Sequence, residues 1–150
     1  MGNICRSPTA EAVFKHVVNE AGLSARIRSD SAGTHAYHIG DPPDARAQRH
    51  AAKRGYDLSA LRARRVEAAD FECFDYVLAM DENNLSLLTR DCPNEYAGKL
   101  ALLMSYGMQA EPIAVPDPYY GGPQDFERVL DMAEDAAQGL LRHIRIRHRL

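Results

Sequence analysis

Two short stretches of this chain hold residues that could do chemistry on an anion, and the first lies at its amino end. Gly2 and Asn3 supply a conformationally permissive backbone, and Arg6 supplies a fixed positive fork. Ser7-Pro8 then has the pattern of a helix cap followed by the first helical position. A loop that enters a helix start offers unpaired N–H groups and a positive dipole, so this stretch predicts a site for an anion such as phosphate.

Asp117 is the second candidate, because it lies between two prolines in Val115-Pro116-Asp117-Pro118. The proline rings restrict the backbone on both sides of the carboxyl group. A carboxyl group held in this way can give a proton to a leaving oxygen and then act as the base that activates water. An Asp beside a proline is also a common turn residue, so the Asp-Pro pair alone leaves both interpretations open.

The elements that must position these residues alternate between helical and strand-like patterns. Apolar residues at helical spacing predict helices at about 10–21, 41–54, 81–91 and 125–148. Alternation or a continuous apolar run predicts strands at 25–29, 76–80 and 99–104. The remaining long stretches are expected to form a short helix with a loop at 59–71 and a proline-rich loop at 107–122.

This order of elements predicts an α/β fold with a doubly wound parallel sheet and helices on both faces. The length predicts a single domain over residues 1–150. A parallel crossover unit begins with a strand, whereas the first element predicted here is a helix. In doubly wound folds the first strand often lies centrally and carries the phosphate loop at its carboxyl end. We therefore expect that the first strand is missing from this sequence.

The composition narrows the class of function. A net charge of −3 argues against a general nucleic-acid binder, whose affinity would need a basic surface. Three cysteines without a paired spacing indicate a reducing compartment, and no apolar run approaches membrane-spanning length. The six histidines show no ligand spacing for a metal. We expect a cytoplasmic protein with neither a nucleic-acid nor a membrane partner.

Four motifs together resemble the low-molecular-weight protein tyrosine phosphatases, and the resemblance covers the chain from Met1 to about Ile146. These motifs are GNICRSPTAEAVF, DSAGTHAY, FDYVLAMDENNL and PDPYYG. The resemblance implies a four-stranded sheet and the hydrolysis of phosphotyrosine proteins or aryl phosphates through a cysteinyl-phosphate intermediate, with no cofactor and no metal. It also implies a Cys-x5-Arg loop whose nucleophilic cysteine would stand immediately before Met1.

The same resemblance gives the candidate residues their roles. Arg6 would bind the phosphate, Ser7 would hydrogen-bond the thiolate, and Asp117 would be the general acid and then the base. The backbone and side chains that surround the phosphate would be those of Gly2, Asn3, Ile4, Cys5 and Arg6.

Four further roles concern the support and the rim of the site. Asn3 and Asp81 resemble residues that support the phosphate loop, and an N-cap role is an equal alternative for Asp81. Tyr119 and Tyr120 could stack on an aromatic substrate at the rim, and packing of one of them into the core is the alternative.

No cysteine of this chain can replace the missing nucleophile. The residues six positions after Cys5, Cys73 and Cys92 are Glu11, Ala79 and Gly98, so none forms Cys-x5-Arg. We therefore predict a truncated chain that is inactive as it stands and that could self-associate where the strand is missing. A catalytically dead phosphate-binding or interaction protein is the alternative. An arsenate reductase of the same fold is less favoured, because it needs neighbouring redox cysteines and these are nineteen or more residues apart.

Overall fold

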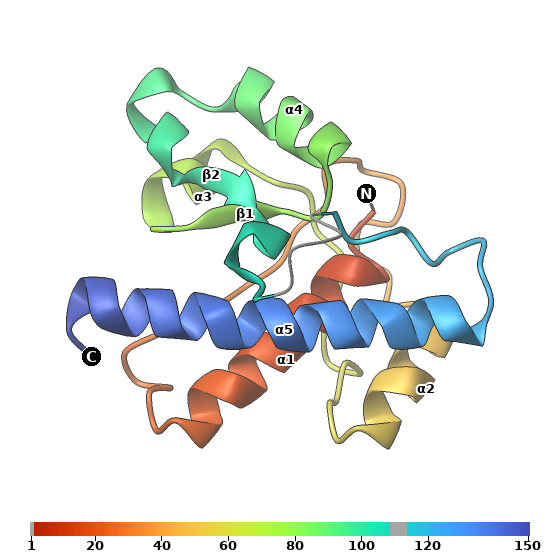
Figure 1. Ribbon diagram of the computed structural model, residues 1–150. Helices are drawn as coiled ribbons and strands as arrows, with labels where there is room; N and C mark the ends of the chain where they lie inside the picture. Colours follow the sequence, from red (N-terminus) through yellow and green to blue (C-terminus); the bar gives the residue numbers. More distant parts are fainter. Residues whose placement is uncertain (1, 109–113) are drawn as a thin grey trace.

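The computed structural model describes residues 2–108 and 114–150, and Figure 1 shows their arrangement. With η marking a 3-10 helix, the elements in chain order are α1 (Arg6–Glu20), α2 (Ala45–Lys53), α3 (Ala68–Cys73), β1 (Val77–Ala79), α4 (Glu82–Asp91), η1 (Asn94–Lys99), β2 (Leu100–Leu102), η2 (Leu103–Tyr106) and α5 (Pro123–His148). The loop expected at 107–122 includes residues 109–113, which lie outside the described residues. Among the helices described, none has the length and apolar character needed to cross a membrane.

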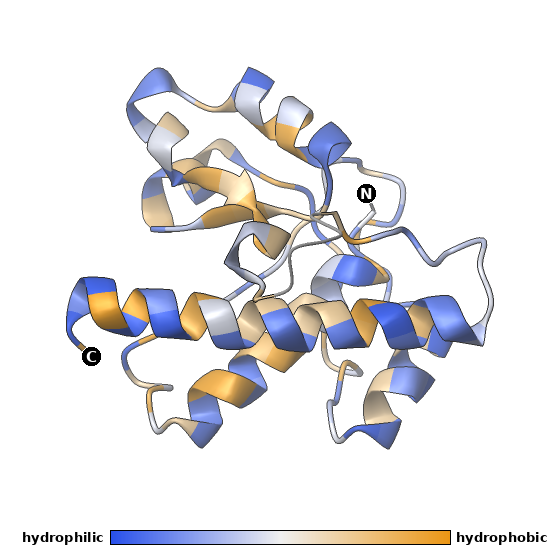
Figure 2. Ribbon diagram, viewed as in Figure 1, coloured by the Kyte–Doolittle hydropathy of each residue, from blue (hydrophilic) through white to orange (hydrophobic). Residues whose placement is uncertain are grey.

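The two strands form a parallel sheet in which Val77 pairs with Leu100 and Ala79 with Leu102. Helix α4 lies on one side of this sheet, and α1 and α5 lie on the other (Figure 1). Phe71 of α3 packs on the α4 side, in a small core with Ala79 and Leu102. Figure 2 shows that both strands are mostly apolar, as expected for a sheet that is covered on both faces. The predicted α/β class, with helices on both faces, is confirmed.

The main core lies between α1 and α5, and it fixes the start of α1. Val13, Phe14, Val17 and Val18 recur at helical spacing on α1 and are each at most 8% exposed. They pack against a buried stripe of α5 that includes Leu130. Since full burial of such a side chain is worth about 1.5–3 kcal/mol, this face holds α1 and its amino end firmly in place.

The strand predicted at 25–29 is wrong. Residues 24–26 form a turn, and residues 27–32 have no regular structure. The Ile27 N–H donates to the Leu23 carbonyl at 3.0 Å, and the Gly33 N–H donates to the Arg64 carbonyl at 2.8 Å. A cavity of about 1110 Å³ lies between this segment and β1, so among the described residues no strand lies next to the segment to form a ladder with it. The described sheet therefore has two strands instead of the predicted three.

The strand predicted at 99–104 is shortened to β2. After Leu102 the chain turns into η2, which buries both Leu103 and Met104, whereas a continued strand would send them to opposite faces. The hydroxyl of Ser105 donates to the Leu102 carbonyl at 2.6 Å and stabilises this turn. An apolar run alone does not distinguish these two outcomes.

Two helix starts also differ from the prediction. Helix α1 begins at Arg6 with Cys5 at the N-cap, so Ser7 and Pro8 lie inside the first turn. Proline is tolerated there because the first N–H groups of a helix have no intrahelical acceptor. The cap of α2 is Asp44, whose carboxylate accepts from the N–H groups of Arg46 and Ala47, and it replaces the predicted cap at residues 41–43.

Helix α2 is held on α5 by a set of ion pairs, called here the carboxylate cluster, formed by Glu127, Asp131 and Glu134. Arg54 donates to all three, at 2.8 Å to Glu127 Oε1 and 2.9 Å to Asp131 Oδ1. The hydroxyl of Tyr56 donates to Glu134 Oε2 at 2.7 Å. These contacts anchor α2 and thereby the loop that precedes it.

Candidate active site

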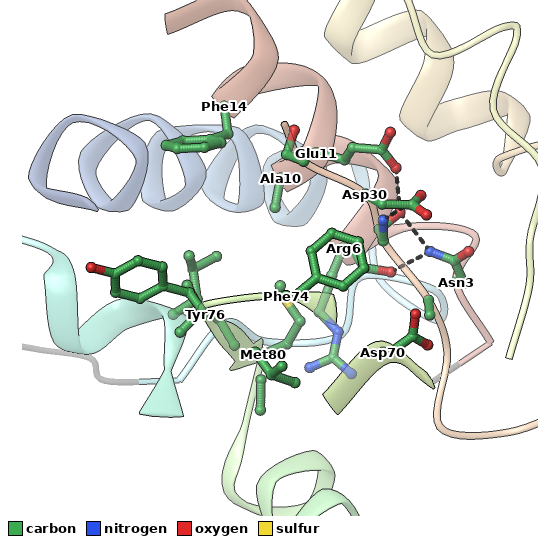
Figure 3. A pocket seen from close by; sticks show the side chains of 18 of the residues that line it. Asn3, Arg6, Ala10, Glu11, Phe14, Asp30, Asp70, Phe74, Tyr76 and Met80 are labelled. Atoms are coloured by element: carbon green, nitrogen blue, oxygen red, sulfur yellow. Dashed lines mark hydrogen bonds between the residues drawn. The ribbon is translucent and has the colours of Figure 1, made fainter. Parts of the chain in front are cut away.

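Arg6 stands at the first position of α1 and lines the cavity (Figure 3). Its side chain is 3% exposed, and its Nη1 donates to Asp81 Oδ2 at 2.7 Å and to the Val115 carbonyl at 2.8 Å. Within the described residues, both recorded hydrogen bonds of the guanidinium use this one nitrogen. Nε and Nη2 are therefore the donors that could bind two oxygens of an anion side by side, as guanidinium binds phosphate.

The start of α1 adds backbone donors beside Arg6. The structure shows no hydrogen bond from the N–H groups of Cys5, Arg6 and Ser7 to the described residues. The carbonyl of Ile4 accepts from the Asp44 N–H at 2.7 Å, which ties the loop to the start of α2. Unpaired N–H groups at a helix start, next to a buried cation, form a site that favours an oxyanion.

Asn3 is the centre of the hydrogen bonds that hold this loop. Its φ is 64°, in the left-handed region, and it is 4% exposed. Its Nδ2 donates to Ser7 Oγ at 2.7 Å and to Ser31 Oγ at 2.9 Å, and its Oδ1 accepts from the Arg64 N–H at 3.1 Å. The Ser31 hydroxyl in turn donates to buried Glu11 at 2.6 Å. These contacts stabilise a backbone conformation that costs about 1–2 kcal/mol outside glycine.

Asp81 makes both of the contacts that the sequence left as alternatives. Its Oδ1 accepts from the Asn84 N–H at 2.8 Å and caps α4, while its Oδ2 accepts from Arg6 at 2.7 Å. Burial acts to raise the pKa of Asp81, but the hydrogen bonds from Asn84 and Arg6 outweigh it and hold the pKa below its usual value. One carboxylate thus links the end of β1, the start of α4 and the start of α1.

Asp117 lies on the same cavity as Arg6, although the two are far apart in the sequence. The Val115 N–H donates to the Met80 carbonyl at 2.8 Å, and the Val115 carbonyl accepts from Arg6. Pro118 is among the most deeply buried side chains, whereas Asp117 is exposed. The Tyr119 N–H donates to Asp117 Oδ1 at 3.1 Å. The loop is therefore fixed on either side of a carboxyl group that remains accessible.

Tyrosines form the rim of the cavity at this end. Tyr119 is 36% exposed and Tyr120 is 94% exposed, so neither is part of the core, and both line the cavity. Their rings meet edge to face at 4.9 Å. Tyr37, 78% exposed, also lines the cavity and was not singled out from the sequence. Its position in a polar loop after a predicted strand is the signal that could have identified it.

Gly2 allows the loop of Tyr37 to approach closely. A Cβ at Gly2 would lie 2.6 Å from the His38 ring, which is too close for two carbon atoms. The predicted phosphate loop and this rim segment are thus in direct contact. A larger residue at position 2 would displace the side chain of His38.

Two of the described thiols, those of Cys5 and Cys73, line the cavity. Cys5 is 6% exposed, and burial, helped by the charges of Asp44 and Asp117, raises the pKa of its thiol to about 12. All three cysteines are free, and Cys73 is exposed. A thiol with so high a pKa stays protonated and unreactive near neutral pH.

Over the two described ranges, no group of three or more His, Cys, Asp and Glu side chains is placed to hold a metal ion. The polar groups that meet at the Arg6 end are instead an arginine, helix-start N–H groups and an accessible carboxyl group. The fold and the site together define an α/β protein in which a buried arginine and unpaired N–H groups at a helix start share a cavity with an accessible carboxyl group.

Comparison with known proteins identifies the family of this chain. Residues 1–149 match the family described as low molecular weight phosphotyrosine protein phosphatase. The chain is 44% identical to a low molecular weight protein-tyrosine-phosphatase of Streptomyces coelicolor, over 96% of this chain and 89% of the relative. It is 46% identical to the human low molecular weight phosphotyrosine protein phosphatase, over 86% and 82% respectively.

A solved structure agrees. The protein tyrosine phosphatase of Entamoeba histolytica, crystallised with Hepes in its active site, superposes with a TM-score of 0.93 at 40% identity, over 99% of this chain and 93% of that one. The chain therefore belongs to the low molecular weight phosphotyrosine protein phosphatases, and the family expected from the four motifs is confirmed.

Proposed function

We propose that this site binds the phosphate of phosphotyrosine in proteins and serves its hydrolysis through a cysteinyl-phosphate intermediate. The observation that carries the proposal is the position of buried Arg6 beside the unpaired N–H groups of α1, with accessible Asp117 on the same cavity. The relative from Entamoeba histolytica holds Hepes, a sulfonate buffer, in its active site, which supports an oxyanion as the ligand of the corresponding site.

The proposed hydrolysis has two steps, and the residues of the site act on the atoms whose charge changes in each step. A thiolate sulfur attacks phosphorus, the bond from phosphorus to the tyrosyl oxygen breaks, and Asp117 gives that oxygen its proton. In the second step Asp117 takes a proton from water, the water oxygen attacks phosphorus, and the sulfur leaves as thiolate. Ser7, whose hydroxyl accepts from Asn3, would donate to that sulfur. Arg6 and the loop N–H groups stabilise the oxygens of phosphorus throughout.

We further propose that the 150-residue chain by itself binds phosphate but turns over no aryl phosphate. None of its three cysteines stands six residues before an arginine, and the thiol nearest to the loop has a pKa of about 12. As a chain alone it would then act as the phosphate-binding protein that was the alternative function. Arsenate reduction is not proposed, because it needs redox cysteines close together, and the three present are nineteen or more residues apart in the sequence. Free thiols support a reducing compartment such as the cytoplasm.

Two measurements test these proposals. Titration with inorganic phosphate should show binding that Arg6→Ala weakens at least tenfold, since a charged bidentate contact is lost. Arg65→Ala, at an exposed arginine, is the matched control and should bind as the unchanged chain does. Equal binding by Arg6→Ala would refute the anion site. Hydrolysis of p-nitrophenyl phosphate by the purified chain, at rates ordinary for an enzyme, would refute the proposed inactivity.

A further inference from the structure

Arg46, in the first turn of α2, joins two separate parts of the candidate site. It donates twice to the carboxylate of Asp44, from Nε to Oδ1 at 3.2 Å and from Nη2 to Oδ2 at 3.0 Å. Its Nη2 also donates to the carbonyl of Tyr119 at 2.8 Å. The N–H of Asp44 donates in turn to the carbonyl of Ile4, in the loop of residues 2–5 that is called here the oxyanion loop. One side chain thus connects the oxyanion loop, through Asp44, with the tyrosine rim.

The guanidinium group of Arg46 also contacts two aromatic rings. Its Cζ lies 4.8 Å from the ring centroid of Phe126 and 5.6 Å from that of Tyr119. Phe126 is 4% exposed and belongs to the main core, near the start of α5. A planar guanidinium group can stack on aromatic rings while its N–H groups donate in the plane. Arg46 therefore links the partly exposed ring of Tyr119 to a rigid part of the fold.

The other recorded contacts of Tyr119 give it little support. Among the described residues, they are with Asp117, Tyr120 and His38. Asp117 belongs to the same loop, and Tyr120 is 94% exposed, so neither ties the ring to a helix. The His38 ring lies 6.5 Å away in another exposed loop of the rim. Arg46 is thus the recorded contact that ties Tyr119 to α2 and α5.

This hold on Tyr119 matters for a ligand that carries an aromatic ring. Tyr119 lines the same cavity as Arg6, whereas Arg46 is not among the described residues that line it. A ring that is already fixed before a ligand binds loses less conformational entropy when it packs against that ligand. A ligand without an aryl group gains nothing from a fixed tyrosine ring. The contacts of Arg46 therefore bear on the aryl group of a ligand and not on its oxyanion.

We propose that Arg46 is a positioning residue that fixes the Tyr119 ring against the aryl group of the ligand, and so makes the site prefer aryl oxyanions to small ones. This role rests on the proposed function, because the oxyanion must bind at Arg6. Loss of the Arg46 side chain leaves the oxyanion loop in place, since Arg6 is held by Asp81 and Val115. The Asp44 N–H keeps its bond to the loop, and the Asp44 carboxylate still accepts from backbone N–H groups of α2.

A pair of phosphonates tests the preference on the unchanged chain. Benzylphosphonate and methylphosphonate present the same oxyanion, differ in the aryl group and have no ester bond to hydrolyse. Isothermal titration calorimetry should show that Arg46→Ala weakens the binding of benzylphosphonate about tenfold, because the Tyr119 ring is no longer fixed. The affinity for methylphosphonate should change by less than about twofold, since that ligand makes no aryl contact. Arg49→Ala, at an exposed position of the same helix, is the matched control and should bind both ligands as the unchanged chain does.

A double-mutant cycle tests whether Arg46 acts through Tyr119. Tyr119→Ala should itself weaken the binding of benzylphosphonate, and adding Arg46→Ala to it should cause no further loss, because the two residues then share one effect. Thermal melts show whether the variants fold. If Arg46→Ala does not fold, Arg46→Lys takes its place. Lysine keeps the charge but cannot donate to Asp44 and Tyr119 with the same planar geometry, so a smaller loss of the same kind is expected.

The outcomes separate this role from the proposed function. If Arg46→Ala weakens both phosphonates equally, Arg46 supports the oxyanion loop, and the proposed role is overturned. Equal losses from Arg46→Ala with and without Tyr119 would overturn an action through that ring. An unchanged chain that binds methylphosphonate as tightly as benzylphosphonate has no aryl preference, which refutes the role of Arg46 but leaves the oxyanion site. An unchanged chain that binds neither refutes the proposed function, and the role of Arg46 with it.

Discussion

Two substitutions of Asp81 should separate the two contacts that this carboxylate makes. Its Oδ1 caps α4 through the Asn84 N–H, and its Oδ2 accepts from Arg6. Asp81→Asn keeps the cap, since asparagine caps helices as well as aspartate does, but removes the negative charge that faces Arg6. Asp81→Ala removes both contacts. The difference in free energy of unfolding between the two variants therefore measures the contribution of the cap. The free energy lost in Asp81→Asn relative to the unchanged chain measures the contribution of the ion pair.

The magnitudes follow from how far each partner is buried. The side chain of Arg6 is 3% exposed and that of Asp81 is 28% exposed. Breaking a fully buried pair costs about 3–5 kcal/mol and an exposed pair about 0–1 kcal/mol, so a value of about 2 kcal/mol is expected for Asp81→Asn. Loss of the cap adds about 1 kcal/mol, which gives about 3 kcal/mol for Asp81→Ala. Urea unfolding at pH 7, followed by circular dichroism, measures both.

The pH dependence of the same variants has a definite sign. The pKa of folded Asp81 is lowered, with the hydrogen bonds from Asn84 and Arg6 outweighing burial, which acts to raise it. The ion pair therefore stabilises the fold above the unfolded pKa of about 3.9 and is lost as pH falls through the lower folded pKa. The difference in free energy of unfolding between the unchanged chain and Asp81→Asn should be constant from pH 7 to 5 and should shrink below about pH 4. A difference under about 0.5 kcal/mol at pH 7 would be the size of an ordinary surface effect and would refute the reasoning. A difference that persists in acid would refute it as well.

Other parts of the molecule give three further tests. Arg46→Lys should speed amide hydrogen exchange in the Tyr119 loop at least tenfold, because Arg46 donates to the Tyr119 carbonyl at 2.8 Å and lies 5.6 Å from its ring centroid; unchanged exchange would contradict this. Arg54→Ala should lower the free energy of unfolding in urea by about 2 kcal/mol, because it leaves the carboxylate cluster without its cation. The loss should be smaller in 1 M NaCl, because salt screens these charges. Arg49→Ala, at an exposed position of the same helix, should cost under about 0.5 kcal/mol, and equal losses would rule out the cluster as the cause. Iodoacetamide at pH 8 should alkylate Cys5 at least a hundredfold more slowly in the folded than in the unfolded chain, since burial raises the pKa of this thiol to about 12, and similar rates would contradict that pKa.

Helices with a clear apolar stripe could be predicted from the sequence, whereas the strand that depends on a partner could not. The prediction at 81–91 matches α4 (Glu82–Asp91) closely, and the long last helix is predicted within two residues of its start. Their periodicity is local and needs no distant neighbour. The segment at 25–29 alternates as a strand would, but a strand also needs a ladder partner, and the cavity lies where that partner would be.

The candidate site shows the same division. Arg6 and Asp117 were identified from their local motifs, since a helix start and a proline-bounded carboxyl group each carry a chemical meaning. The contact of Arg6 with Val115, 109 residues away, has no local signal and comes from packing. Asp81 was left between two roles because sequence alone does not show that one carboxylate has two oxygens facing two donors. Tyr37 was missed because a single exposed aromatic in a loop has no periodic partner.

The end of β1 explains why residues so distant act in one place. Met80 accepts from the Val115 N–H, Val115 and Asp81 both accept from Arg6, and Asp81 caps α4. Each bond of this set uses a group that would be costly to bury unpaired, so the loss of any one would leave a partner unsatisfied. The oxyanion loop is therefore held from the β2 side of the sheet, through β1 and the Asp117 loop.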